Sequence, residues 1–153
     1  MNKERVSKEL TAEIEKEIYQ IDRLKEELDQ IKARQEIYFK RAKGSILHDF
    51  YNACERIFRH ILQEVNGILP EDYAWHKNLL YKMTLDIKGI RPRVISEELA
   101  AELDEYLGFR HLFRNIYGFE LQGNKIDNLI KNFARVHRKF KKEVRIFLKK
   151  IKI

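Results

Sequence analysis

The stretch Phe109-Arg110-His111-Leu112-Phe113-Arg114-Asn115-Ile116-Tyr117 places an arginine in the middle of an apolar helix face. The apolar members of that face, at helical spacing, are Leu99, Leu103, Tyr106, Phe113 and Tyr117. A guanidinium cannot lose its proton, and burying it without a partner is very costly. Arg110 must therefore pair with a carboxylate such as Glu55, reach the rim of the core, or face an anion such as a phosphate.

The composition favours helix throughout the chain. Charged residues make up 36% of the 153 residues, and there are only two prolines. No apolar run approaches the ~18 residues of a membrane span, and the charged start of the chain does not resemble a signal peptide. The single cysteine, Cys54, lies on an apolar stripe, so we expect a buried thiol. Together these features favour a cytoplasmic protein that is not bound to a membrane.

Two long helices are expected in the first half of the chain. Apolar residues at steps of three and four over residues 3–34 predict an amphipathic helix with a narrow, coiled-coil-like seam. A wider apolar stripe over residues 47–65 predicts a more central helix that ends at Asn66-Gly67. The boundary between the two stays open, because residues 33–43 contain no strong helix breaker and Gly44 is the only weak point.

Three further helices follow. A short one is expected over residues 75–85. Ser96 is followed by two glutamates and predicts the N-cap of a fourth helix, which ends just before Gly118. Asn124 resembles the start of a capping box and begins the last helix. The sequence therefore predicts an all-α bundle of four long helices and one short helix, in a single domain over residues 1–153.

The net charge of +7 is concentrated at the C-terminal end. From Asn124 onward the chain contains eleven Lys and Arg residues but only two acids, Asp127 and Glu143. This segment therefore carries a net charge of +9, and the rest of the chain carries −2. One interpretation is a solvated helix face that keeps the protein soluble. The other is an electrostatic footprint for RNA or for an acidic partner.

Several groups that bind anions or transfer protons are expected to converge on the fourth helix. Arg110, Arg114 and Tyr117 are spaced i, i+4, i+7, and His111 and Asn115 lie on the adjacent strip. Together they could hold a phosphodiester. The chain has no Gly-rich phosphate loop, zinc-type spacing or HExxH, so we expect no cofactor and no metal ion.

This region resembles the HepT-like toxins of the HEPN domain superfamily, whose motif reads Arg-x4-His-x-Tyr. Residues 110–117 fit this frame except that Asn115 stands where the histidine belongs. Further stretches resemble the same proteins in the same order, namely Ile46-Leu47-His48-Asp49-Phe50-Tyr51-Asn52-Ala53-Cys54-Glu55-Arg56-Ile57-Phe58, Trp75-His76-Lys77-Asn78-Leu79-Leu80, Ile90-Arg91-Pro92-Arg93-Val94-Ile95-Ser96 and Phe119-Glu120-Leu121.

The resemblance implies a HEPN-like bundle that acts as a metal-independent endoribonuclease toxin, with its RNA cleft formed between the two protomers of a homodimer. Its antitoxin would be a minimal nucleotidyltransferase, which in some systems adenylylates the motif tyrosine. Arg110 would bind the scissile phosphate, with Arg114 as a second cation. Tyr117 would be the modifiable tyrosine, and His111 the polar residue that follows the arginine.

Asn115 is the departure from the motif, and it leaves alternatives open. An amide cannot accept a proton from a ribose 2′-hydroxyl near neutral pH. We expect His111 to do this work in a site of Arg110, His111 and Asn115. If it does not, the protein is a weak or inactive binding module that partners a nucleotidyltransferase. A second alternative is a coiled-coil-like interaction protein that acts through its long first helix.

Overall fold

A computed structural model describes residues 3–67, 75–117 and 123–151. Within these ranges the chain forms α-helices and no β-strand, apart from one isolated bridge between Ile87 and Arg91. The elements in order are α1 (Lys3–Ile31), α2 (Ile37–Ile61), the π-helical turn η1 (Leu62–Asn66), α3 (Trp75–Met83), α4 (Glu97–Asn115) and α5 (Gly123–Ile151). The expected all-α bundle of four long helices and one short helix is confirmed.

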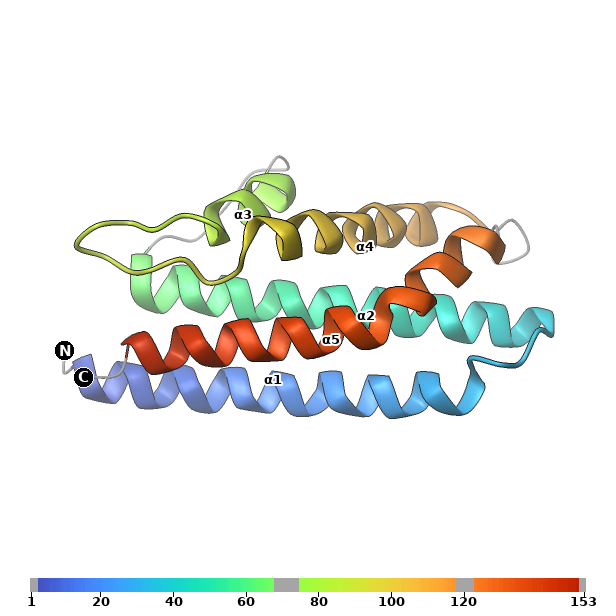
Figure 1. The fold of residues 1–153 in the computed structure, drawn as a ribbon, viewed down its shortest axis with the longest axis horizontal. Coiled ribbons are helices and arrows are strands. Elements are labelled where there is room, and N and C mark those ends of the chain that lie inside the picture. The colour runs from blue at the N-terminus through green and yellow to red at the C-terminus, as the bar shows by residue number, and fades with distance from the viewer. Residues whose placement is uncertain (1–2, 68–74, 118–122, 152–153) are drawn as a thin grey trace.

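The long helices run roughly antiparallel along one axis (Figure 1). The helix α1 packs on α2 and α5, while α4 packs on α2 and α5 from the other side, and α3 covers the start of α4. The start of α1 and the end of α5 lie at the same end of the bundle (Figure 1). The contact between α2 and α4 is the part of this arrangement that positions the candidate site.

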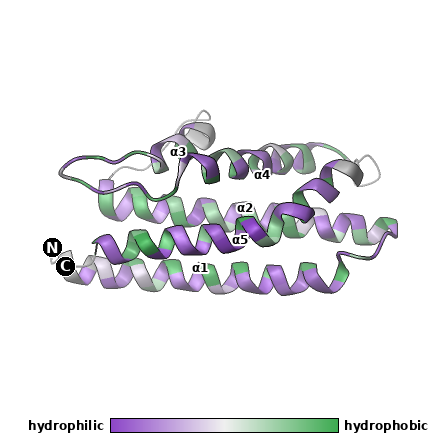
Figure 2. Cartoon of the chain, in the orientation of Figure 1, coloured by the Kyte–Doolittle hydropathy of each residue, from purple (hydrophilic) through white to green (hydrophobic). Residues whose placement is uncertain are grey.

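One apolar cluster connects the helices. Its members alternate with polar residues along α1, α2 and α5, as the hydropathy colouring in Figure 2 shows. The seam of α1 is part of this core, with Leu10, Ile14 and Ile21 at 0% exposure. That seam therefore packs inside the chain's own bundle, which argues against the alternative in which the first helix serves as a docking surface. Cys54 is buried as expected.

The turn between α1 and α2 lies earlier in the chain than Gly44, the one weak helix position that the sequence offers in this region. The first helix ends at Ile31 rather than near residue 34, and Gly44 lies inside α2. Charged side chains close the turn instead of glycine or proline: Arg34 pairs with Glu36 at 2.9 Å, and the Lys43 ammonium donates to the Arg34 carbonyl. These contacts depend on folded geometry, so helical periodicity does not reveal them.

Other helix ends follow the sequence more closely. The Ser96 hydroxyl accepts a hydrogen bond from the Leu99 amide at 3.2 Å, which confirms the predicted N-cap of α4. Gly67 ends the second helix in a left-handed conformation, φ 71°, although the last turn before it is π-helical. The helix α3 ends at Met83, two residues earlier than expected, and α5 begins at Gly123, one residue before Asn124. Gly118 lies outside the described residues.

The fourth helix ends at Asn115, before Tyr117. Ile116 is extended, with φ −129° and ψ 159°, so Tyr117 does not continue the apolar helix face. The Asn115 side chain donates to the His111 carbonyl at 2.7 Å and thereby occupies an acceptor of the last turn. The prediction that Tyr117 shares a helical strip with Arg110 and Arg114 is therefore wrong.

Candidate functional site

Arg110 lies inside the bundle and pairs with a carboxylate. One of its Nη atoms is 3.2 Å from Glu55 Oε2, and the two side chains are 5% and 8% exposed. The other Nη donates to Asn52 Oδ1 at 2.8 Å, and the guanidinium carbon lies 4.9 Å from the centre of the Tyr51 ring. Of the three situations open to this arginine, the structure shows the carboxylate pair, with an amide and an aromatic face completing its surroundings.

Arg114, one turn further along α4, reaches a histidine that the sequence did not single out. Its Nε donates to His48 Nε2 at 2.9 Å, and its Nη2 donates to Asn52 Oδ1 at 3.2 Å. Because an arginine only donates, His48 Nε2 must accept, which leaves the imidazole proton on Nδ1. That nitrogen lies 3.1 Å from Asp49 Oδ1, so carboxylate, imidazole and guanidinium follow one another in a chain.

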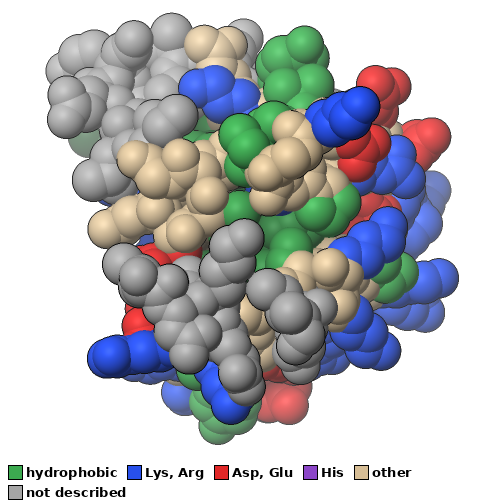
Figure 3. Space-filling model, turned by 90° about the vertical axis from the view of Figure 1, so that its left-hand side faces the viewer, with side chains coloured by type: hydrophobic (Ala, Val, Ile, Leu, Met, Phe, Trp, Pro, Cys, Tyr) green, Lys and Arg blue, Asp and Glu red, His purple; other side chains and the backbone are tan. Residues whose placement is uncertain are grey.

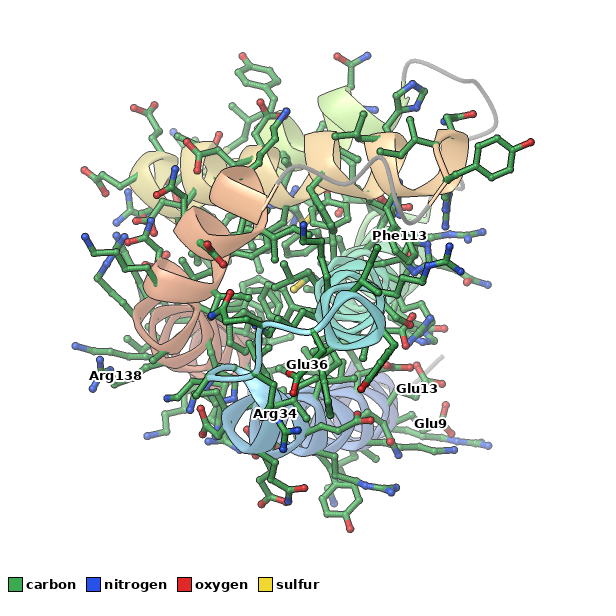
Figure 4. The ribbon with its side chains drawn as sticks, turned by 90° about the vertical axis from the view of Figure 1, so that its right-hand side faces the viewer. Glu9, Glu13, Arg34, Glu36, Phe113 and Arg138 are labelled. Carbon is green, nitrogen blue, oxygen red and sulfur yellow. The ribbon has the colours of Figure 1, made fainter. Side chains whose placement is uncertain are left out.

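Phe113 supports this arrangement from the side. Its ring centre lies 5.5 Å from that of His48 and 5.9 Å from that of Phe109. In Figure 4 the Phe113 side chain lies between the ends of α4 and α2, on the side away from α5. The imidazole is 18% exposed, whereas Arg114 is an exposed residue. The histidine is thus held in place while the arginine remains accessible from solvent.

We call these side chains the α2–α4 cluster: His48, Asn52, Glu55, Arg110 and Arg114. The burial of these side chains decreases from the interior of the bundle to its surface. Glu55 and Arg110 are sealed in the bundle, Asn52 accepts from both arginines, and His48 and Arg114 meet at the surface. A hollow of about 700 Å³ between α1 and α2 has Asp49 and Asn52 in its wall. Arg114 is exposed to solvent, where a phosphate can reach it, whereas Arg110 is buried.

The other predicted site residues lie outside this cluster. His111 is exposed, and Asn115 is exposed and bonded to the His111 carbonyl. Tyr117 is 69% exposed and follows the end of the helix. The structure thus brings Arg110 and Arg114 together through Asn52, while His111, Asn115 and Tyr117 lie on the surface nearby in sequence.

Sequence reasoning missed His48, Asn52 and Asp49, although one signal was present. His48, Asn52 and Glu55 are spaced i, i+4, i+7 along α2, so they form a polar strip beside its apolar stripe. Such a strip also suits an ordinary solvated face. Only the position of α4 shows that this strip receives both arginines.

Other titratable groups have structural roles. His137 Nε2 lies 2.8 Å from Asp22 Oδ1, and Lys141 contacts the same oxygen at 2.8 Å, so the His137 imidazole has a polar partner at the rim of the core. Burial lowers the pKa of the His137 imidazole, against the opposing effect of Asp22. Burial also raises the pKa of the Cys54 thiol well above its usual value. No His, Cys, Asp and Glu group suited to a metal ion occurs among the described residues.

A second buried arginine, Arg91, shows how differently such a group can be satisfied. Its guanidinium donates to Asn66 Oδ1 at 3.0 Å and to the backbone carbonyls of Lys82, Leu85 and Pro92 at 2.9–3.2 Å. Neutral oxygens alone surround it in these bonds. Arg91 therefore ties the segment after α3 to the end of η1.

Comparison with known proteins adds one match. A family model described as HepT-like protein matches residues 42–151. This range includes most of α2 and all of α3, α4 and α5, hence the whole α2–α4 cluster, and leaves α1 outside. The comparisons with curated proteins and with solved structures gave no match. No helix within the described ranges has the length and apolar character needed to cross a membrane.

Proposed function

Since the chain belongs to the family of HepT-like proteins, we propose that it is the toxin of a toxin–antitoxin pair and cleaves RNA without a metal ion. The observation that carries this proposal is the contact between Arg114 and His48, at 2.9 Å, on an accessible surface. This contact supports the proposal because a guanidinium can bind a phosphate and an imidazole nitrogen can accept a proton, the two functions that phosphodiester cleavage by the neighbouring 2′-hydroxyl requires.

In the proposed reaction Arg114 turns from His48 to the scissile phosphate. The freed Nε2 of His48 then takes the proton of the ribose 2′-hydroxyl, while Asp49 holds the other ring nitrogen. The 2′-oxygen bonds to phosphorus and the bond from phosphorus to the 5′-oxygen breaks. The leaving 5′-oxygen receives a proton, for which the exposed His111 is the second imidazole available. The products are a 2′,3′-cyclic phosphate and a 5′-hydroxyl.

His48 thereby takes the role that the histidine of the family motif would have at position 115. The Asn115 amide is neither acid nor base, and its Nδ2 is bonded to a backbone carbonyl. Arg110 becomes a positioning residue: it holds Asn52, which in turn accepts from Arg114. This differs from the expectation that Arg110 itself binds the phosphate, because its side chain is only 5% exposed.

We also propose a homodimer with the end of α4 near the two-fold axis. His111, Arg114, Asn115 and Tyr117 are all exposed there. A two-fold contact would bring two copies of this surface together and double the cationic groups in one cleft. Sedimentation that shows a strict monomer at micromolar concentration would reject the dimer.

The proposed antitoxin is a minimal nucleotidyltransferase that adenylylates Tyr117. That phenol belongs to a side chain that is 69% exposed and follows Arg114 by three residues. Adenylylation would add a phosphate and bulk beside the cluster, so it would compete with RNA for Arg114. Mass spectrometry after co-expression with the proposed nucleotidyltransferase antitoxin should show one added adenylate, and Tyr117→Phe should remove it.

The test of the toxin assignment is expression with and without that nucleotidyltransferase. The proposal predicts arrested growth and fragmented RNA from the chain alone, and normal growth with intact RNA from the pair. Normal growth and intact RNA under both conditions would contradict it.

The second candidate is a binding module that presents an acceptor tyrosine and does not cleave RNA. It is favoured by the two features that depart from the family motif, the Asn115 amide and the ion pair that seals Arg110. Adenylylation of Tyr117 without any RNA cleavage by the unmodified protein would select this candidate.

A further inference from the structure

A basic groove lies at the opposite end of α4 from the α2–α4 cluster. It runs between α5 and the residues that precede α4, and encloses a hollow of about 600 Å³. We call it the α5 groove and define it by its cations: Arg93, Arg135, Arg138, Lys139, Lys142 and Lys150. The end-on view in Figure 3 shows many Lys and Arg side chains on the right-hand side of the molecule.

The charges of this groove are mostly not neutralised by the protein. Two acids, Glu98 and Glu143, line it beside the six cations. Glu143 is already engaged, because its carboxylate accepts from the Ser96 amide and from the Ser96 hydroxyl, the latter at 3.1 Å. Arg135 pairs with Glu102 at 2.6 Å. Among the described residues, the other five cations of the groove have no acidic partner.

The opposite side of the same helix behaves differently. Lys141 contacts Asp22 at 2.8 Å and Arg145 contacts Glu15 at 3.0 Å, so the acids of α1 neutralise that side of α5. The C-terminal excess of positive charge is therefore directed into the groove. A uniformly solvated face would not show this division.

From this division we infer that the α5 groove is a second anion site, which binds the phosphates of an RNA strand. Five of its six cations lie on α5 and extend over roughly 22 Å of the helix, from Arg135 to Lys150. The apolar lining residues Val94 and Phe147 are only 2% and 1% exposed, because they belong to the core. Only Ile146, at 41%, offers apolar area, which is little for an acidic protein partner that needs a buried anchor.

The groove is separate from the α2–α4 cluster. Eighteen residues of α4 separate Ser96, at the groove, from Arg114, which corresponds to roughly 27 Å along the helix. In Figure 4 Arg138 and Phe113 also lie on opposite sides of the bundle. RNA in the groove is therefore held several nucleotides away from the site of cleavage, and the groove contributes affinity rather than chemistry.

The inference rests on RNA as the proposed substrate, but its test is binding and requires no cleavage. We would measure the affinity of the full chain for a fluorescent oligouridine at increasing salt. The groove variant carries Arg138→Gln, Lys139→Gln and Lys142→Gln. The control removes the same charge from exposed positions outside the groove, with Lys16→Gln, Arg41→Gln and Lys88→Gln. Thermal melts verify that all proteins are folded.

The groove variant should bind more weakly than the control and flatten the salt dependence by about 2 in the log–log slope, since each lost phosphate contact with a single strand removes ~0.7. Binding by wild type without cleavage would overturn the ribonuclease proposal and leave this inference standing. Absence of RNA binding by wild type, or equal slopes in groove variant and control, would overturn the inference. The inference would also be overturned if polyglutamate bound more tightly than the oligouridine and lost the same affinity in the groove variant.

Discussion

A guanidinium nitrogen of Arg110 lies 3.2 Å from a carboxylate oxygen of Glu55, and both side chains are almost completely buried. The pair joins α4 to α2 in the part of the bundle where Asn52 connects it to Arg114 and, through Arg114, to His48. A buried ion pair contributes little when intact, but removing one partner leaves a buried charge without compensation. The interior of the bundle and the candidate site at its surface are thus coupled through this pair.

Arg110→Ala should destabilise the protein by ~3–5 kcal/mol, because it leaves Glu55 charged and buried. Urea unfolding monitored by circular dichroism measures this directly. The double variant Glu55→Leu/Arg110→Met removes both charges and should recover most of the stability. A loss below about 1 kcal/mol in Arg110→Ala would show that Glu55 does not depend on this arginine in the folded protein.

Asn115→His should raise RNA cleavage. The substitution restores the family motif and adds a proton acceptor on the exposed end of α4, where the present amide can only form hydrogen bonds. Loss of the bond from Asn115 to the His111 carbonyl is expected to cost little, since the helix end is exposed. The measurement is the initial cleavage rate of both proteins at equal concentration, and a lower rate in the histidine variant would contradict the prediction.

Stability should fall as the pH decreases below the ordinary histidine pKa of 6.5. Burial lowers the pKa of His137 in the folded protein, so the unfolded chain takes up this proton at a higher pH. Over the window between the two pKa values the unfolded chain binds more protons, and falling pH therefore favours unfolding. The free energy of unfolding, measured at pH values above and below this window, should fall more in wild type than in His137→Gln. Identical falls would remove His137 from the explanation.

Cys54 should resist alkylation in the folded protein. Its side chain is 0% exposed, so a reagent cannot reach the sulfur. Burial also raises the pKa of the thiol, so little of it is in the reactive thiolate form. Iodoacetamide should label it only at the rate of unfolding, and at once in concentrated urea. Rapid labelling under native conditions would mean that the core around α2 opens frequently.

Local sequence rules predicted several features of this fold. Helical periodicity placed the apolar stripes, the hydroxyl of Ser96 marked the start of α4, and an apolar neighbourhood identified Cys54 as buried. The family match confirms the resemblance to HepT-like proteins. Each of these depends on residues that are close together in the chain or on a pattern that extends over most of it.

The contacts that define the candidate site could not be predicted in this way. His48 and Arg114 are separated by 66 positions, and only the packing of α4 on α2 brings them together. Tyr117 was misplaced because periodicity continues to it, whereas the chain becomes extended at Ile116. From its position beside the apolar stripe of the second helix, Glu55 is a possible partner of Arg110. The sequence allows a phosphate as the partner equally well, and only the burial of Arg110 distinguishes the two.

The most direct test of the account is RNA cleavage by purified Arg114→Gln and His48→Gln, compared with Arg41→Gln and His60→Gln as matched controls. His60 lies on the same helix as His48 and contacts Glu13 at 3.0 Å, away from the cluster. We expect His48→Gln to lose ~10²–10⁴-fold in rate, as for a missing proton acceptor, and Arg114→Gln to be strongly impaired as well. All four proteins should melt near the wild-type temperature. Wild-type rates in His48→Gln and Arg114→Gln would contradict the assignment of the α2–α4 cluster as the site of cleavage.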